Sequence, residues 1–482
     1  MKYYLGIDMG TSSIKACLID EDGEILFNQT EKSILLNPEE GFFEVNPVES
    51  WWNGFKKICN KISKKYDLKK IKSICISSLC GTVVPVDDEF NPVYNAILYG
   101  IDTRSKNQAE RLNEFYGEEK LKNELGGIFT THSIIPKVLW LKENKPEIYS
   151  KSKYFLESNN FVSARLVEET AWDFPTAAGS RLVNLKTNEL PYEIFDDFEL
   201  DKNKFPKLKW PLDVLGKIKE KASKETGLSQ DTTVFCGACD INAEAMASGA
   251  IDPGDLVVVY GSTVSTLLTT DRYITLSGFA PGMSLIEGTY RIGAPTSSGG
   301  RFLEWIDHFF EIENVDFEYE VPTNIIILPY LDGARAPFDN PEASGVFYGI
   351  RRTTSKNEIH QASRETLGYE TYLLIKKMKK VYEEPKRINV LGGMAKNKKI
   401  MQLISDITGK ELIIHNDIDA SFGDAKIALT VDNSIAEIND LKGIKSIISK
   451  REIIRPDLKT HEKYMKMTEK YEDVYKDLFS TR

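Results

Sequence analysis

Cysteine and histidine are scarce in this chain. Its 482 residues include only five histidines, which are scattered and form no ligand motif. There are six cysteines, and most of them lie in apolar segments: Cys17, Cys59, Cys75, Cys80, Cys236 and Cys239. Dilute cysteines in apolar surroundings are typical of reduced, buried thiols, so we expect no disulfide framework.

One cysteine pair has a recognisable spacing. Cys236-Gly237-Ala238-Cys239 is a CxxC sequence, which can indicate redox chemistry or half of a zinc site. A zinc site needs a second pair, and the spacing of Cys75 and Cys80 does not supply one. We therefore expect these thiols to be packed in the core.

Long apolar runs and clustered basic residues are also missing. No apolar run approaches the ~20 residues of a membrane span. The net charge is −10, and the sequence contains no cluster of lysine or arginine residues that could form a basic surface. We therefore expect neither nucleic acid nor a membrane as a partner. Because strand-like sequence begins at Lys2, we expect no signal peptide and a cytoplasmic location. A homodimer is an open alternative for the oligomeric state.

Two common ATP-site patterns are absent as well: there is no GxxxxGK[ST] run and no protein-kinase motif set. What the chain does have is a short hairpin at its start. Apolar runs flank Asp8-Met9-Gly10-Thr11-Ser12, which predicts a tight turn between two strands. Glycine lets the backbone approach an anion, and Asp8 at the strand end could hold Mg²⁺ through water. The alternative is an ordinary glycine-containing hairpin turn.

A second hairpin of this kind follows about 250 residues later. Leu256–Leu268 is again two apolar runs around a turn, Gly261-Ser262-Thr263. The length of the chain suggests about two or three domains, and two related α/β halves with a cleft between them would explain the repeated hairpin. We place the division near residue 245.

Periodicity and flanking residues predict further elements. Strands are expected at 3–8, 14–19, 24–27, 71–77 and 83–87. Helices are expected at 47–66, 102–116, 136–150, 300–311, 355–381, 396–408 and 458–479. The segment 170–210 is rich in Pro, Asp, Asn and Trp, and we expect it to be irregular and on the substrate side.

Several short motifs occur in a familiar order along nearly the whole chain. They are Gly6–Ser12, Trp51-Trp52, Ile97–Arg104, Gly237–Asp240, Gly261–Thr263, Leu328–Pro337, Gly345–Ile350, Leu391–Asn397 and Ala420–Ala425. In this order and spacing the chain resembles the FGGY carbohydrate kinases, and among them the xylulokinase-like members. Arg364 departs from the family signature, where an apolar residue is usual.

The resemblance implies a fold and a reaction. The fold is α/β, a two-domain actin-like ATPase (ribonuclease H-like) fold with an interdomain cleft. The domains would be 1–245, with the sugar site and catalytic aspartate, and 246–482, with adenosine binding. The reaction is phosphoryl transfer from ATP to a sugar hydroxyl, with Mg²⁺. The rival is an actin- or chaperone-like ATPase that moves no phosphate to a small molecule, but such proteins lack the motif at Leu328–Pro337.

The resemblance also implies roles for particular residues. Asp240 would be the general base, and Asp8 and Asp240 would hold the metal; the alternative for Asp240 is a helix N-cap. The residues expected to bind ATP are Thr11, Ser12, Ser13, Gly261, Ser262, Thr263, Gly392, Gly393 and Asn397. For Asn397 a helix N-cap is the alternative.

The acceptor is less well defined by sequence. Xylulokinase-like members carry Gly-Gln-Met-His-Gly and glycerol kinases Gln-Arg-Glu-Thr where this chain has Ser78-Leu79-Cys80-Gly81-Thr82. Sugar contacts are expected from Cys80, Gly81, Thr82, Asp102, Arg104, Asp173 and Asp240. Asp102 and Arg104 could instead form an interdomain ion pair. Similarity favours a ketopentose such as xylulose, with another polyol, an aldonate such as gluconate or a signalling sugar as alternatives.

Overall fold

The computed structural model describes residues 1–312, 321–430, 443–444, 447 and 451–479. It contains two compact units. Unit 1 comprises Met1–Ile251, Gly282–Thr289 and Ile418–Ile448, and unit 2 comprises Asp252–Pro281, Tyr290–Asp417 and Ser449–Arg482. Within the described ranges, no helix is long and apolar enough to cross a membrane.

Unit 1 is built on a seven-stranded mixed sheet. Its strand order is β12-β13-β6-β1-β2-β3, with β14 also paired to β6. The bounds are β1 Tyr3–Met9, β2 Ser13–Asp20, β3 Ile25–Lys32, β6 Ile71–Ser78, β12 Val214–Lys217, β13 Thr233–Phe235 and β14 Ala238–Cys239. Strand β1 is buried along its whole length, as its apolar sequence predicts, and pairs antiparallel with β2 and parallel with β6. The first hairpin is therefore confirmed.

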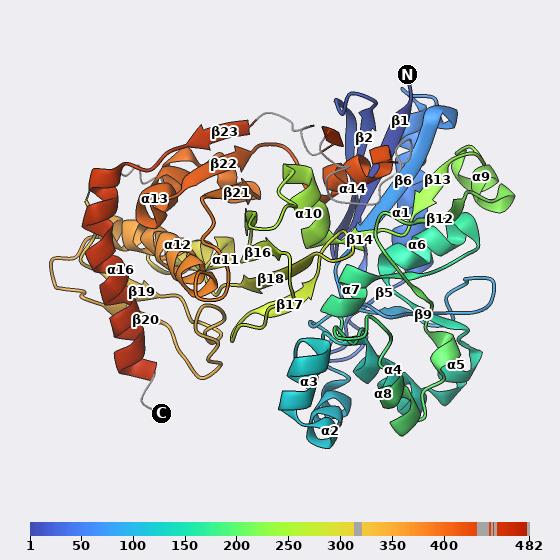
Figure 1. Ribbon diagram of the computed structural model, residues 1–482, viewed down its shortest axis with the longest axis horizontal. Coiled ribbons are helices and arrows are strands. Elements are labelled where there is room, and N and C mark those ends of the chain that lie inside the picture. The colour runs from blue at the N-terminus through green and yellow to red at the C-terminus, as the bar shows by residue number, and fades with distance from the viewer. Residues whose placement is uncertain (313–320, 431–442, 445–446, 448–450, 480–482) are drawn as a thin grey trace. The chain divides into compact units, whose positions relative to one another are not determined.

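Shorter strands and helices surround this sheet (Figure 1). The short strands are β4 Leu35–Leu36, β5 Glu44–Val45, β7 Val84–Val86, β8 Ala96–Ile97, β9 Tyr154–Leu156, β10 Trp172–Asp173 and β11 Leu208–Lys209. The helices are α1 Asn53–Ser63, α2 Lys106–Tyr116, α3 Glu118–Leu125, α4 Ile134–Asn144, α5 Pro146–Lys151, α6 Ser158–Val167, α7 Phe174–Gly179, α8 Tyr192–Asp197, α9 Glu220–Thr226, α10 Asp240–Ser248 and α14 Ala420–Leu429. A π-helical turn, Pro47–Trp52, precedes α1, and 3-10 turns cover Leu68–Lys70 and Lys202–Lys204.

Helix α14 is distant in sequence from the rest of unit 1 but packs against β1, β6 and α10 (Figure 1). The close approach depends on Gly6 in β1. A Cβ at Gly6 would lie 1.9 Å from the carbonyl oxygen of Ser421, so no larger residue fits there without moving the helix. The compact units thus differ from two continuous stretches, because the segment from Ile418 returns to unit 1.

Unit 2 repeats the strand arrangement of unit 1. Its seven-stranded sheet has the order β17-β18-β16-β15-β21-β22-β23. The bounds are β15 Leu256–Tyr260, β16 Val264–Thr270, β17 Ala280–Met283, β18 Tyr290–Pro295, β21 Arg387–Leu391, β22 Glu411–His415 and β23 Arg451–Ile454. As in unit 1, an antiparallel hairpin (β15 and β16) is followed on its open side by parallel strands (β21 and β22). The expected repeat of hairpin and α/β half is therefore present in the topology.

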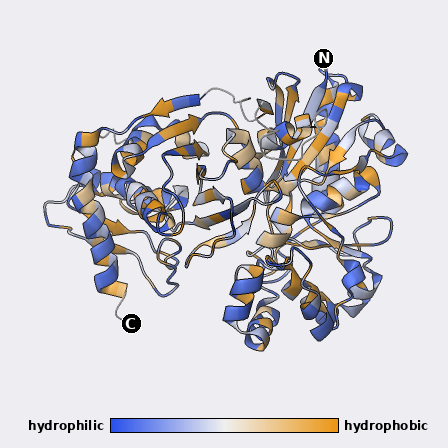
Figure 2. Cartoon of the chain, in the orientation of Figure 1, coloured by the Kyte–Doolittle hydropathy of each residue, from blue (hydrophilic) through white to orange (hydrophobic). Residues whose placement is uncertain are grey.

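The other elements of unit 2 cover this sheet. They are α11 Gly300–Phe309, β19 Ile326–Leu328, β20 Val346–Tyr348, α12 Lys356–Met378, the 3-10 turn Gly393–Lys396, α13 Lys398–Thr408 and α16 Leu458–Phe479. Helix α16 buries a stripe of side chains that include Tyr464, Tyr471 and Val474, and Figure 2 shows both hydrophilic and hydrophobic colours along it. This is the amphipathic pattern that the sequence predicts for 458–479.

Local sequence explains where some expected elements differ. The helix expected at 136–150 is two helices, α4 and α5, because Pro146 cannot continue α4 and starts α5 instead. The segment 170–210 is not wholly irregular, since it contains α7, α8 and two short strands. The helix expected at 102–116 begins at Lys106.

Candidate active site

The hairpin of β1 and β2 places a carboxylate beside a lysine on the facing strand. Asp8 Oδ2 accepts a hydrogen bond from Lys15 Nζ at 3.2 Å, and the same Nζ lies 3.5 Å from Asp419 Oδ2. Burial raises the pKa of Asp8 to about 6, although the charge of Lys15 opposes this shift. Burial alone would lower the pKa of Lys15, but Asp8 and Asp419 raise it above its ordinary value. Lys15 therefore bridges Asp8 in β1 and Asp419, which directly precedes α14.

More carboxylates lie around Asp8 on α10 and α14. Asp240 and Glu244 are one helical turn apart on α10, and both are half-buried. Burial, followed by the charges of Asp240 and Asp8, raises the pKa of Glu244 well above its usual range. Asp424 on α14 is fully buried, and Ser77 Oγ donates to its Oδ2 at 2.6 Å. Burial raises the pKa values of Asp8, Glu244 and Asp424 alike, so the charge of a bound cation would favour ionisation of these clustered carboxyl groups.

Asp240 is the first residue of α10, directly after β14. The N-cap of the helix is Cys239, so Asp240 is not the N-cap that sequence left as its alternative. Its Oδ1 accepts hydrogen bonds from the amide of Ile241 at 2.7 Å and from Cys239 Sγ at 3.3 Å. A carboxylate in the first turn of a helix is stabilised by the helix dipole, which favours its ionised, proton-accepting form.

The segment expected to meet the sugar follows β6 and is held by a carboxyl group. Glu157 Oε2 accepts hydrogen bonds from the amides of Gly81 and Thr82, each at 2.8 Å. Gly81 has a φ of 96°, and a Cβ there would lie 2.1 Å from the carbonyl oxygen of His132. Only glycine fits this conformation and this contact. Burial raises the pKa of Glu157 to about 8.

The loop before α4 lies against the same segment. His132 is half-buried, and burial lowers its pKa to about 3, so its ring is neutral. Lys137 is fully buried and donates to the carbonyl oxygens of Thr131 and, at 3.4 Å, Ser133. Burial also lowers the pKa of Lys137 to about 7. Burial thus lowers the pKa values of both basic groups around Gly81.

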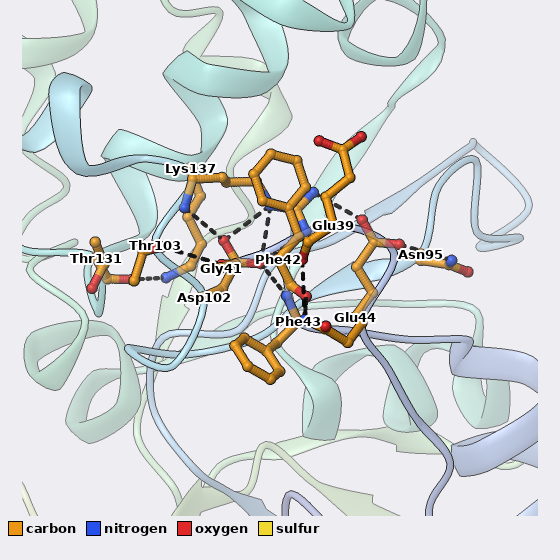
Figure 3. Close-up of polar contacts among 12 residues, drawn as sticks. Glu39, Gly41, Phe42, Phe43, Glu44, Asn95, Asp102, Thr103, Thr131 and Lys137 are labelled. Carbon is orange, nitrogen blue, oxygen red and sulfur yellow. Dashed lines mark hydrogen bonds and ion pairs between the residues drawn. The ribbon is translucent and has the colours of Figure 1, made fainter.

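Asp102 and Arg104 form an ion pair, as the alternative left open by the sequence proposed, but both residues lie inside unit 1 and the pair does not join two domains. The pair is fully buried, and Arg104 Nη2 lies 2.8 Å from Asp102 Oδ2. Arg104 also donates to Glu44 Oε1 at 2.8 Å. The amide of Phe43 donates to Asp102 Oδ2 at 2.7 Å (Figure 3). Both charged groups are engaged in holding this segment, and a sugar contact from either remains a prediction.

Asp173 is fully buried and caps a helix. Its Oδ1 accepts the amide of Thr176 at 2.8 Å at the start of α7, and Asn159 Nδ2 donates to its Oδ2 at 3.3 Å. Burial raises its pKa to about 6. The structure therefore gives Asp173 a capping role, and its expected sugar contact stays a prediction.

In the first hairpin turn, Thr11 Oγ1 donates to the Tyr99 hydroxyl at 3.2 Å, and Ser12 is exposed. In unit 2, the second turn lines a cavity of about 220 Å³. The cavity is bounded by Ser262, Thr263, Thr296, Ser297, Ser298, Arg301, Phe302, Trp305, Pro329, Leu331, Asp332, Gly333 and Arg335. The amides of Gly300 and Arg301, at the start of α11, donate to the carbonyl oxygens of Gly261 and Ser262 at 2.9 and 3.1 Å.

The glycine turn after β21 is also well defined. Gly392 has a φ of 99° and is followed by the 3-10 turn that begins at Gly393. Asn397 is the N-cap of α13, and its side chain accepts the amide of Ile400 at 3.2 Å. The structure therefore shows the helix N-cap that the sequence analysis gave as the alternative for Asn397. Contacts from these residues to ATP stay predictions.

Sequence reasoning missed several residues of the site in unit 1: Lys15, His132, Lys137, Glu157, Glu244 and Asp419. Lys15 and Asp419 could have been predicted from the sequence. Lys15 is two residues into the second strand of the hairpin, and Asp419 directly precedes the motif at Ala420. Nothing in the sequence connects Glu157 to Gly81, because the contact spans 76 residues. Among the described residues, no three His, Cys, Asp or Glu side chains form a group that could hold a metal ion.

The chain is similar to known proteins over its whole length. A xylulose kinase of Staphylococcus epidermidis is 26% identical over 487 residues, covering 98% of this chain and 96% of that protein. A gluconokinase of Bacillus subtilis is 25% identical over 442 residues, 87% of this chain and 85% of that protein. The crystal structure of a ligand-bound xylulose kinase from Lactobacillus acidophilus matches with a TM-score of 0.89 at 23% identity, covering 100% of this chain and 99% of that one.

Both units also contain sequence that matches one family. Residues 3–247 match the N-terminal domain of the FGGY family of carbohydrate kinases, and residues 256–430 match its C-terminal domain. The two-domain α/β fold expected from the motifs is confirmed by the structural match. The chain therefore belongs to the FGGY family of carbohydrate kinases, which use ATP to phosphorylate sugars.

Proposed function

We propose that this kinase phosphorylates a neutral ketopentose such as xylulose, and that Asp240 is the general base. The observation that carries the proposal is the position of Asp240: a half-buried carboxylate in the first turn of α10, in the same unit as Asp8 and the first hairpin turn. A carboxylate held within ~3 Å of a sugar hydroxyl can accept its proton as the oxygen attacks phosphorus.

The charges near the expected sugar segment favour a neutral acceptor over an aldonate. A gluconate carboxylate needs a cation to bind it, because burying an unpaired charge is costly. The guanidinium of Arg104 is engaged by Asp102 and Glu44. Lys137 is buried on backbone carbonyls, with its pKa lowered to about 7 by burial. Neither cation is placed to bind an added carboxylate, which supports xylulose rather than gluconate.

The carboxylates of the site fit a divalent cation. Mg²⁺ prefers oxygen ligands and commonly uses one or two carboxylates together with waters and phosphate oxygens. Asp8 and Asp240 are the residues that would hold it, and the pKa of Asp8, raised to about 6 by burial, indicates a place where added positive charge is favourable. Bound there, Mg²⁺ would neutralise charge on the phosphates of ATP.

The remaining roles follow the positions of the two hairpin turns. Thr11, Ser12 and Ser13 in unit 1 would donate hydrogen bonds to phosphate oxygens, as would Gly261, Ser262 and Thr263 in unit 2. Gly392, Gly393 and Asn397 would lie at the adenosine. Free, buried cysteines and ATP as donor suit a cytoplasmic enzyme, and we propose that location.

The experiment is coupled ADP release with Mg-ATP across D-xylulose, D-ribulose, L-ribulose, D-fructose, glycerol and gluconate. We expect D-xylulose to raise the rate at least about tenfold over the sugar-free rate, and gluconate to leave it unchanged. Preference for gluconate would contradict the charge argument. A rate of ATP hydrolysis that no compound in the panel changes would contradict the assignment of a sugar acceptor.

A further inference from the structure

Two cysteines that are far apart in sequence touch beside the proposed base. Cys80 Sγ and Cys239 Sγ lie 2.9 Å apart, although 159 residues separate them. Both residues are buried, with exposed fractions of 8% and 3%, and neither is part of a disulfide. The contact joins one cysteine of the CxxC sequence to a residue outside it.

The sheet of unit 1 explains why these cysteines meet. Strands β6 and β14 are parallel neighbours, and Cys239 pairs with Ser78 at the end of β6. Cys80 follows two residues later, where the chain leaves the strand. The two sulfur atoms already lie 2.9 Å apart, and the S–S bond of a disulfide is about 2.05 Å long. Only a small movement is needed to bring the two sulfur atoms to bonding distance.

We propose that Cys80 and Cys239 form a reversible disulfide that turns the kinase off, with a hydroperoxide as the oxidant. In the first step one thiolate attacks the peroxide oxygen, giving a sulfenic acid and, from hydrogen peroxide, one water. The second thiol then attacks the sulfenic sulfur and releases a second water. Overall, two thiols lose two protons and two electrons, and hydrogen peroxide is reduced to two waters.

The disulfide would act on both sides of the proposed site, and this consequence rests on the proposed function. Cys239 is the N-cap of α10, and its thiol donates to Asp240 Oδ1 at 3.3 Å. Oxidation removes that donor. Cys80 directly precedes Gly81 and Thr82, whose amides are held by Glu157. Drawing the sulfurs from 2.9 Å to about 2.05 Å would pull this segment toward Asp240. A misplacement of about 1 Å can cost on the order of 10²-fold in rate.

The other four cysteines are buried thiols that lie outside this contact. Burial raises the pKa of the Cys59 thiol to about 12, and it raises the pKa values of Cys17, Cys75 and Cys236 above their ordinary range. The thiolate is the reactive form, so a raised pKa slows oxidation. Cys236 is the useful control, because it is the other cysteine of the CxxC sequence and is fully buried.

The test oxidises the full-length reduced protein with hydrogen peroxide, blocks the remaining thiols and maps the linked peptides by mass spectrometry. We expect a Cys80–Cys239 linked peptide, a loss of sugar-dependent ADP release of about 10²-fold in the same samples, and recovery of both with dithiothreitol. Cys236→Ala should still form the link and lose activity. Cys80→Ala and Cys239→Ala should form no link, and whatever activity each retains should resist peroxide.

Several results would overturn the proposal. These are the absence of a Cys80–Cys239 peptide in the oxidised wild-type protein, a Cys236–Cys239 peptide in its place, and full activity in protein that carries the link. Failure of the proposed function gives a different result. In that case the reduced protein would phosphorylate no sugar, while the linked peptide would still form and would support the disulfide by itself.

Discussion

Glu157 shows how one buried side chain can organise the segment that we propose binds the sugar. Its Oε2 accepts both the Gly81 and the Thr82 amides, so these two donors are fixed in direction without water. Because burial raises its pKa to about 8, the carboxyl group is largely protonated at pH 7 and acts through a neutral oxygen acceptor. A glutamine at this position keeps such an acceptor, whereas an alanine removes it.

We therefore predict different effects for two substitutions of Glu157. Glu157→Ala should raise the KM for the sugar by about tenfold or more, because two buried amides lose their acceptor and the segment moves. Glu157→Gln should stay within about threefold of the wild-type KM. The measurement is the sugar dependence of ADP release at saturating ATP. A glutamine variant as poor as the alanine variant would show that charge, and not the acceptor geometry, is what matters at this position.

At the scale of single elements, α14 carries a buried lysine. Lys426 is fully buried, its Nζ donates to the carbonyl oxygen of Ala247 at 3.4 Å, and it lies 5.9 Å from the ring centre of Phe422. Burial lowers its pKa to about 7 from an ordinary 10.5. Between these two values the unfolded chain holds a proton that the folded chain has lost. The contribution of Lys426 to stability therefore rises as the pH increases from about 7 to 10.5.

Lys426→Met should remove this pH dependence. We predict that the variant is more stable than the wild type at pH 7 by ~1–4 kcal/mol, and that the gap narrows as the pH approaches 10. Denaturant unfolding at several pH values measures the difference. The control is Lys398→Met on α13, whose lysine side chain is 73% exposed and should show no such trend. A gap that is constant or widens with pH would contradict the assignment.

Elements with local signals were predictable, and those that depend on distant contacts were not. The hairpin β1–β2 and the helix α16 follow from apolar periodicity alone. The division of the expected helix 136–150 into α4 and α5 also has a local cause, Pro146, although the apolar periodicity continues across it. By contrast, the return of α14 to β1 depends on the fit between Gly6 and Ser421, which are more than 400 residues apart. Arg364, which departs from the family signature, pairs with Asp307 at 2.5 Å, and a structural partner of this kind cannot be found from spacing.

Residues of the candidate active site were likewise predictable from local signals, whereas their contacts with distant residues were not. Asp8 and Asp240 were placed from strand ends and motif order, and the structure puts both in unit 1. The ion pair of Asp102 and Arg104 was an open alternative that needed coordinates to decide. The contact of Cys80 with Cys239 depends on the pairing of β6 with β14, which the CxxC spacing does not reveal.

At the scale of the whole molecule, two sheets each carry an antiparallel hairpin beside parallel strands, and both domains of the FGGY carbohydrate kinases are matched. The repeated turns alone would fit any nucleotide-dependent protein of this fold. In our proposal, the carboxylate at the start of α10 is what distinguishes a sugar kinase from those other proteins, because a base is required only when a hydroxyl must lose its proton.

The most direct test is therefore the rate of sugar-dependent ADP release by Asp240→Asn, with ATP binding measured by calorimetry on the same protein. Glu220→Gln is the matched control, because Glu220 is also the first residue of a helix, α9, but is exposed. We predict that Asp240→Asn loses about 10²–10⁴-fold in kcat and binds ATP nearly as the wild type does, while the control keeps its rate. A near wild-type rate for Asp240→Asn would contradict the assignment of the base.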